Sequence, residues 1–130
     1  MSENVDMLDI THFSYGGGWQ AKVGPEVLNG IISQLPKQYE PRLVHGFENS
    51  EDAIVYELDN DNYLLNTVDF FTPIYYDPYV FGQITAANSL SDIFAMGGKV
   101  LNCLNILAFP KSINPLVIQE MLKGAINKVQ

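Results

Sequence analysis

The sequence has little that would cross-link it or carry it across a membrane. Its 130 residues include one cysteine, Cys103, which excludes an internal disulfide and a cysteine-cluster metal site. The apolar runs are too short to span a bilayer. The first ten residues contain acids but no lysine or arginine, unlike a secretory signal. We therefore expect a cytoplasmic protein with no membrane partner.

Basic residues are also scarce. There are 7 lysine and arginine residues against 15 aspartate and glutamate residues, so the formal net charge is −8. Residues 1–65 hold 11 of these acids and 3 of the bases, and this half therefore carries all of the net charge. An acidic surface repels phosphate backbones, so we expect no nucleic-acid partner. The acids suit a cation-binding site, although a solvated acidic face is the commoner explanation.

The apolar pattern is that of a globular α+β domain. Hydrophobic residues make up 47% of the chain, too many for a disordered protein. The spacing of apolar residues, together with the glycine and proline residues between segments, predicts helices, a hairpin of two strands and one further strand. In chain order, these are a helix at 25–35, strands at 53–58 and 63–71, a helix at 78–96, a strand at 100–109 and a helix at 115–129. This order predicts an α+β fold.

A glycine-rich segment precedes the first helix. We expect residues 1–24 to form a flexible loop and residues 25–130 to form the domain. Three glycines at 16–18 permit close approach to a phosphate, and Lys22 supplies a positive charge, although a mobile N-terminal segment explains them equally well. The last helix has no glycine or turn after it, so we expect the chain to be the front part of a longer protein.

Three aspartates stand out by their context. Asp52 immediately precedes a strand, Asp69 lies within TVDFF, and Asp92 lies within NSLSDIFAMGG. A carboxylate within an apolar strand or helix is costly unless it is paired or coordinated. Carboxylate oxygens suit Mg²⁺, often with phosphate oxygens completing its shell. In the alternative, each aspartate is a cap or turn residue, and for Asp52 alone that explanation is favoured.

Residues 66–110 resemble the selenophosphate synthetase (selenide, water dikinase) family. The string NTVDFFTPIYYDPYVFGQITAANSLSDIFAMGG is long and specific, and the SEDAIVY and GGG…AK segments match in the expected order. The resemblance covers nearly all of this chain but only the N-terminal part of the family's chain. It implies the α+β fold of the aminoimidazole ribonucleotide synthetase superfamily, with strands pairing across a homodimer and a C-terminal domain absent here.

The resemblance also implies a reaction and its site. The family makes selenophosphate from selenide, ATP and water, releasing AMP and phosphate, with Mg²⁺ as cofactor. By motif position, the magnesium ligands are Asp52, Asp69 and Asp92. The implied ATP-binding residues are Lys22, Asn49, Ser50, Glu51, Asp69 and Asp92. Lys22 also matches the family's catalytic lysine.

Position 19 departs from the family pattern. The family has cysteine or selenocysteine three residues before its catalytic lysine, where this chain has Trp19. An indole cannot act as a chalcogen nucleophile. Our hypothesis is that the natural residue is selenocysteine, because its codon, UGA, differs by one base from the tryptophan codon UGG. The alternative is a true tryptophan in an inactive homologue.

Two other functions stay open. Another ATP-using enzyme of the same superfamily would share the aspartate positions, but the TVDFFTPI and SLSDIFAMGG strings favour selenophosphate synthetases. A non-catalytic dimerisation or regulatory homologue would keep the strand pairing without the chemistry. Trp19 and the absent second domain favour it for this chain alone, so we expect the isolated 130 residues to be inactive.

Overall fold

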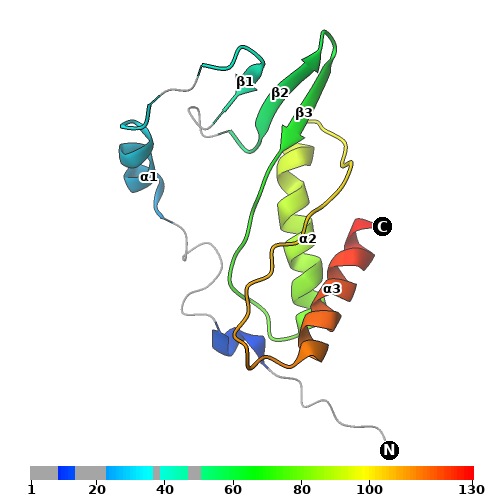
Figure 1. Ribbon diagram of the computed structural model, residues 1–130. Coiled ribbons are helices and arrows are strands. Elements are labelled where there is room, and N and C mark those ends of the chain that lie inside the picture. The colour runs from blue at the N-terminus through cyan, green and yellow to red at the C-terminus, as the bar shows by residue number, and fades with distance from the viewer. Residues whose placement is uncertain (1–8, 14–22, 37–38, 47–50) are drawn as a thin grey trace, which may run out of the picture. The chain divides into compact units, whose positions relative to one another are not determined.

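The computed structural model describes residues 9–13, 23–36, 39–46 and 51–130. Helices and an antiparallel sheet confirm the expected α+β class. The elements in chain order are η1 (Ile10–Phe13), α1 (Pro25–Ile32), β1 (Leu43–His45), β2 (Ile54–Asp59), β3 (Asn62–Asn66), α2 (Pro78–Ala95) and α3 (Pro115–Val129) (Figure 1).

Contacts divide the described chain into two compact units. The helical unit contains η1, the first part of α2, and α3. The sheet unit contains α1, the three strands and the last part of α2. No helix among the described residues is both long and apolar enough to cross a membrane.

The sheet unit is built on the predicted hairpin. The strand order is β1-β2-β3, with both pairs antiparallel, and the register places Val55 opposite Leu65. In the turn, the Asn62 side-chain amide donates to Asp59 Oδ1 at 2.6 Å, which is the local hydrogen bonding that favours Asp and Asn at such positions. The hairpin prediction is therefore confirmed, while the short strand β1 was not predicted.

The two long helices begin at the predicted residues. Asp77 Oδ1 accepts from the Val80 N–H at 3.1 Å, just before α2 begins at Pro78. Asn114 Oδ1 accepts from the Leu116 N–H at 2.9 Å, just before α3 begins at Pro115. A proline costs nothing in the first turn, because the N–H groups there have no partner within the helix. The helix starts thus follow from capping chemistry that is legible in the sequence.

The core of the helical unit gathers side chains from η1, α2 and α3. Phe81 is buried on α2, and the ring of Phe71 meets it edge to face with centroids 5.7 Å apart. Such pairs add a specific aromatic contact to the ordinary burial of apolar area. The other buried members of this core are Ile10, Ile113, Val117 and Met121.

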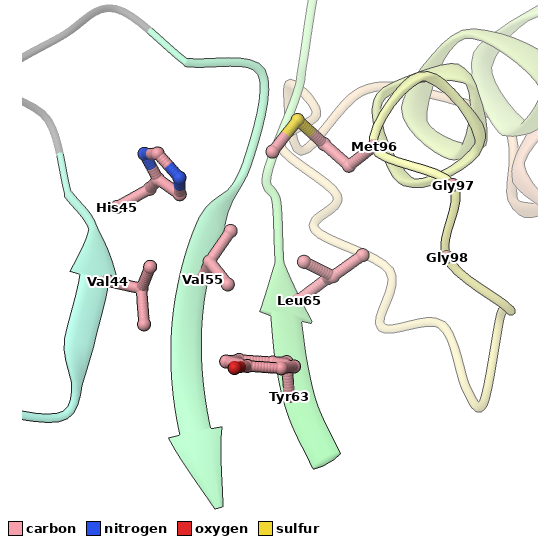
Figure 2. A pocket seen from close by; sticks show the side chains of 8 residues that line it. All are labelled: Val44, His45, Val55, Tyr63, Leu65, Met96, Gly97 and Gly98. Atoms are coloured by element: carbon pink, nitrogen blue, oxygen red, sulfur yellow. The ribbon is translucent and has the colours of Figure 1, made fainter. Parts of the chain in front are cut away.

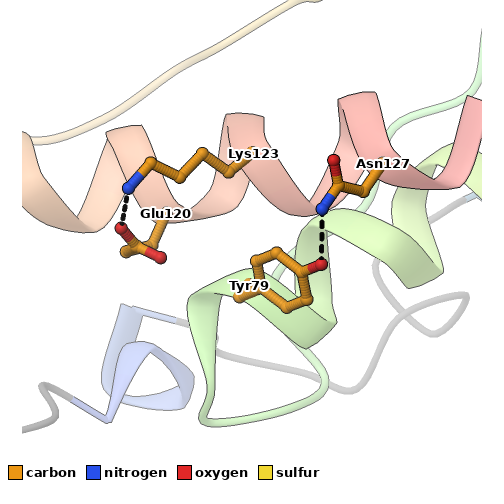
Figure 3. Close-up of polar contacts among 4 residues, drawn as sticks. All are labelled: Tyr79, Glu120, Lys123 and Asn127. Atoms are coloured by element: carbon orange, nitrogen blue, oxygen red, sulfur yellow. Dashed lines mark hydrogen bonds and ion pairs between the residues drawn. The ribbon is translucent and has the colours of Figure 1, made fainter. Parts of the chain in front are cut away.

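Helices α2 and α3 touch backbone to backbone at two glycines. A Cβ atom on Gly82 would overlap the Met121 carbonyl, and a Cβ atom on Gly124 would overlap the Tyr79 carbonyl. Beside this crossing, the Asn127 side-chain amide donates to the Tyr79 hydroxyl at 2.8 Å (Figure 3). The two helices can approach this closely only because both positions lack a side chain.

Two predicted strand segments are not strands in the structure. The segment 100–109 contains no strand, and β3 ends at Asn66 instead of continuing to residue 71. Several of their apolar side chains are exposed, including Phe70 at 71% and Leu104 at 92%. A strand needs a neighbour for its backbone N–H and C=O groups, and the described residues form no strand pair along either segment.

The glycine crossing yields the first prediction. Gly82→Ala and Gly124→Ala should each lower the free energy of unfolding by about 1–3 kcal/mol, because the new methyl group meets rigid backbone. The measurement is urea unfolding followed by circular dichroism. Gly30→Ala is the matched control, because its Cβ would meet nothing within 4 Å. That control should be neutral or stabilise by up to about 1 kcal/mol. Equal effects at all three positions would contradict the close crossing.

Candidate functional site

The Asp92 carboxylate accepts a hydrogen bond from a hydroxyl group that is distant in the sequence. The Thr67 hydroxyl donates to Asp92 Oδ2 at 2.7 Å, and both residues are half-buried. Thr67 directly follows β3, whereas Asp92 lies in the last turn of α2. This hydrogen bond orients a carboxylate that the sequence predicted to be functional.

The C-terminal end of α2 is electrostatically unfavourable for an acidic side chain. The C-terminal turn of a helix carries partial negative charge, so a carboxylate there is destabilising by about 0.3–1 kcal/mol and a cation is favoured. The last turn of α2 contains no basic residue. Asp92 therefore adds its charge to a helix end that is already negative, where a nearby cation is favoured.

The turn after α2 is built by two glycines. Gly97 has a φ of 73°, in the left-handed region that glycine adopts without strain. The Gly98 N–H donates to the Ile93 carbonyl at 2.9 Å, and a Cβ on Gly98 would overlap the Leu65 side chain of β3. The turn at the helix end thus packs closely against Leu65 of the strand that leads to Thr67.

The other predicted acids lie around the same sheet. Asp52 is exposed and stands two residues before β2 begins, and Asp69 is half-buried two residues after Thr67. The Glu51 carboxylate lies 3.6 Å from His45 Nδ1 on β1. All of these residues belong to the sheet unit.

The meeting of the three aspartates around one ion stays a prediction. In the ranges that the structure describes, no group of three or more His, Cys, Asp or Glu side chains is arranged to hold a metal ion. The chemistry of the donors nevertheless fits Mg²⁺, because carboxylate oxygens are the hard ligands it prefers. The predicted residues Trp19, Lys22, Asn49 and Ser50 lie outside the described residues.

An open hollow of about 470 Å³ lies beside the sheet and was not predicted (Figure 2). His45 borders it, and its Nδ1 is buried with no hydrogen-bond partner among the described residues, the Glu51 carboxylate lying 3.6 Å away. The remaining lining is mostly apolar and consists of Val44, Val55, Tyr63, Leu65, Met96, Gly97 and Gly98. The sequence offered no signal for this hollow, because it depends on the unpredicted strand β1.

Two residues with shifted pKa values lie in the helical unit. The Thr11 hydroxyl and backbone N–H both donate to Asp9, and these hydrogen bonds lower the pKa of the Asp9 carboxyl. A hydrogen bond with Tyr76 raises the pKa of the Tyr75 hydroxyl. Both effects arise between near neighbours in the sequence and have no part in the aspartate site.

Comparison with known families places the β2–β3 hairpin, α2 and α3 in one domain. Residues 50–130 match the AIR synthase related protein, N-terminal domain. The chain belongs to this family. The match includes Asp52, Asp69 and Asp92 as well as Thr67.

Curated relatives support the more specific resemblance. The chain is 50% identical over 122 residues to the selenide, water dikinase of Clostridioides difficile, which is 93% of this chain and 35% of that protein. It is 42% identical over its full 130 residues to the selenide, water dikinase of Clostridium botulinum, covering 37% of that protein. Selenide, water dikinase 2 of Peptoclostridium acidaminophilum is 47% identical over 94% of this chain and 35% of its own length.

The resemblance to selenide, water dikinases is therefore confirmed along almost the whole chain. The chain spans little more than one third of the length of these relatives.

The turn after α2 gives the second prediction. Gly97→Ala should lower the free energy of unfolding by roughly 1–2 kcal/mol, because a Cβ disfavours the left-handed backbone. Gly97→Asn should cost less, since asparagine tolerates this region. Gly30→Ala is again the control, because neither position has an atom within 4 Å of a new Cβ. Chemical denaturation measures the effect, and equal losses for Ala and Asn would speak against a backbone cause.

Proposed function

We propose that this chain is the N-terminal part of a selenide, water dikinase. The reaction is the formation of selenophosphate from selenide, ATP and water, with release of AMP and phosphate. The observation that carries the proposal is 50% identity to the Clostridioides difficile relative over 93% of this chain. Because the chain covers 35% of that relative, turnover requires the remaining part of the protein.

In this proposal, the described aspartates bind the magnesium–nucleotide complex. Asp52, Asp69 and Asp92 would hold Mg²⁺, and Asp69 and Asp92 would also bind the nucleotide. When bound, Mg²⁺ would neutralise phosphate charge, the chemistry that phosphoryl transfer needs. A chain with a net charge of −8 repels ATP, so these carboxylates bind it only through cations. Lys22 contributes a positive charge to the phosphates.

The residues before β2 complete the proposed nucleotide site. Asn49, Ser50 and Glu51 directly precede Asp52 and bind the nucleotide in this proposal. Position 19 holds the chalcogen nucleophile in the active protein, where selenocysteine or cysteine replaces Trp19. A cytoplasmic location, supported by the single cysteine, belongs to the same proposal.

The third prediction tests the reaction in a completed chain. The completed chain consists of these 130 residues with Trp19→Cys, followed by the remaining C-terminal part of the Clostridioides difficile relative. It should convert ATP to AMP and phosphate only when selenide is present, and ³¹P NMR should detect selenophosphate. Asp69→Asn should lower the rate by about 100-fold or more, as expected when one charge-stabilising group is removed.

The control for this experiment makes the same chemical change elsewhere. Asp61→Asn removes an exposed carboxylate from the turn between β2 and β3, and its rate should match that of the completed chain. Formation of AMP without selenide, or equal rates for the Asp61 and Asp69 variants, would refute the proposed function.

We also propose that the chain forms a homodimer through its exposed apolar segments after β3 and after α2. The family resemblance implies strand pairing between subunits, and two observations support it. Val68 and Phe70 after β3 are 70% and 71% exposed, and Leu101 and Leu104 are 81% and 92% exposed. Exposed apolar segments without a strand neighbour are prone to pair with another chain.

The fourth prediction concerns this assembly. The 130-residue chain should be a dimer at micromolar concentration by light scattering, and Leu104→Lys should shift it toward monomer, because it places a charge on an apolar pairing segment. Val27→Lys is the control, since Val27 is 61% exposed on α1 and outside both segments. A monomeric original chain would contradict the proposed dimer, as would equal dissociation of both variants.

A further inference from the structure

We propose that Thr67 is a positioning residue that orients the Asp92 carboxylate for binding of the magnesium–nucleotide complex. The inference rests on the proposed function and deepens it, because it names a residue outside the predicted ligand set. Its basis is the 2.7 Å hydrogen bond from the Thr67 hydroxyl to Asp92 Oδ2, which joins residues 25 positions apart.

The bond constrains the direction of the carboxylate. The hydrogen bond is made to Oδ2, so it restricts rotation about the Cβ–Cγ bond of Asp92. This restriction also sets the direction of Oδ1. Outer groups that hydrogen-bond to a ligating carboxylate commonly fix ligand orientation in metal sites. Asp92 is half-buried, so its orientation depends more on such a protein partner than an exposed carboxylate would.

The chemical nature of the donor favours cation binding over simple structural pairing. A lysine or arginine would neutralise Asp92, and the last turn of α2 contains no basic residue. A threonine hydroxyl holds the carboxylate but leaves its full negative charge in place. Because that charge adds to the negative end of the helix, the arrangement keeps an oriented anion available for a cation.

The backbone on both sides of the hydrogen bond is firmly placed. Thr67 directly follows β3, and Leu65 of β3 packs against Gly98 so closely that a Cβ on this glycine would overlap it. The Met96 N–H donates to the Asp92 carbonyl at 3.2 Å, which ties Asp92 into the end of the helix. Leu65 and Gly98 thus lie against one another within the sheet unit, which also holds Thr67 and Asp92.

The test compares Thr67→Val, which removes the donor with little change of shape, with Thr67→Ser, which keeps it. Both are made in the completed chain, and calorimetry measures the affinity for Mg²⁺ in the presence of a non-hydrolysable ATP analogue. Thr67→Val should weaken Mg²⁺ binding by about 10–100-fold, the effect typical of lost outer-shell partners. Thr67→Ser should restore affinity close to that of the completed chain.

Melting temperatures in EDTA separate positioning from a purely structural role. If Thr67→Val lowers the melting temperature but leaves Mg²⁺ affinity unchanged, the hydrogen bond is structural and the inference is overturned. Asp92→Asn distinguishes this from failure of the proposed function. Loss of Mg²⁺ binding in Asp92→Asn but not in Thr67→Val keeps the proposed function and rejects the role of Thr67. If the completed chain without these substitutions binds the nucleotide equally well with and without Mg²⁺, both the proposed function and the role of Thr67 are rejected.

Discussion

The close crossing of α2 and α3 is the constraint on which the helical unit depends. At Gly82 and Gly124 a backbone carbonyl of one helix occupies the space that a side chain would need on the other. This approach brings Phe81 of α2 into one core with Val117 and Met121 of α3. A larger residue at either glycine would separate the helices and open that core, since packed interiors have little spare volume. The first part of α2 is therefore specified by shape as much as by hydrophobicity.

The last part of the same helix follows a different rule. Helix ends are normally stabilised by charges that complement the dipole, yet the last turn of α2 contains Asp92 and no basic residue. The chain holds this carboxylate with a threonine hydroxyl and a tight glycine turn. Natural sequences break such local rules mainly at functional sites, where the cost is balanced by packing elsewhere. The placement of Asp92 is consistent with that principle.

Features with a local cause could be predicted from the sequence. The starts of α2 and α3 follow from Asp77, Asn114 and the prolines after them, and the hairpin follows from the turn after Asp59. The family string likewise identified the domain, because sequence identity needs no coordinates.

Features that depend on distant partners could not be predicted in the same way. The strand β1 has three residues and exists through its pairing with β2, so periodicity gave no sign of it. The predicted strand at 100–109 has a strand-like composition but no strand neighbour in the described residues. Thr67 was missed as a partner of Asp92 because a hydroxyl 25 positions away carries no pattern of its own. The sequence signal was the unusual setting of Asp92, which indicated that some partner must exist.

The segment after β3 links the proposed site to the proposed subunit interface. From residue 67 to residue 71, half-buried and exposed positions alternate, as they do along a strand with one covered face. Thr67 and Asp69 fall on the covered side, whereas Val68 and Phe70 fall on the exposed side. With a period of two, a shift by one residue would exchange the two sets and turn the polar groups outward. A strand neighbour supplied by a second subunit would fix this register. In the proposed enzyme, dimer formation and orientation of the magnesium-binding carboxylates would then depend on the same few residues.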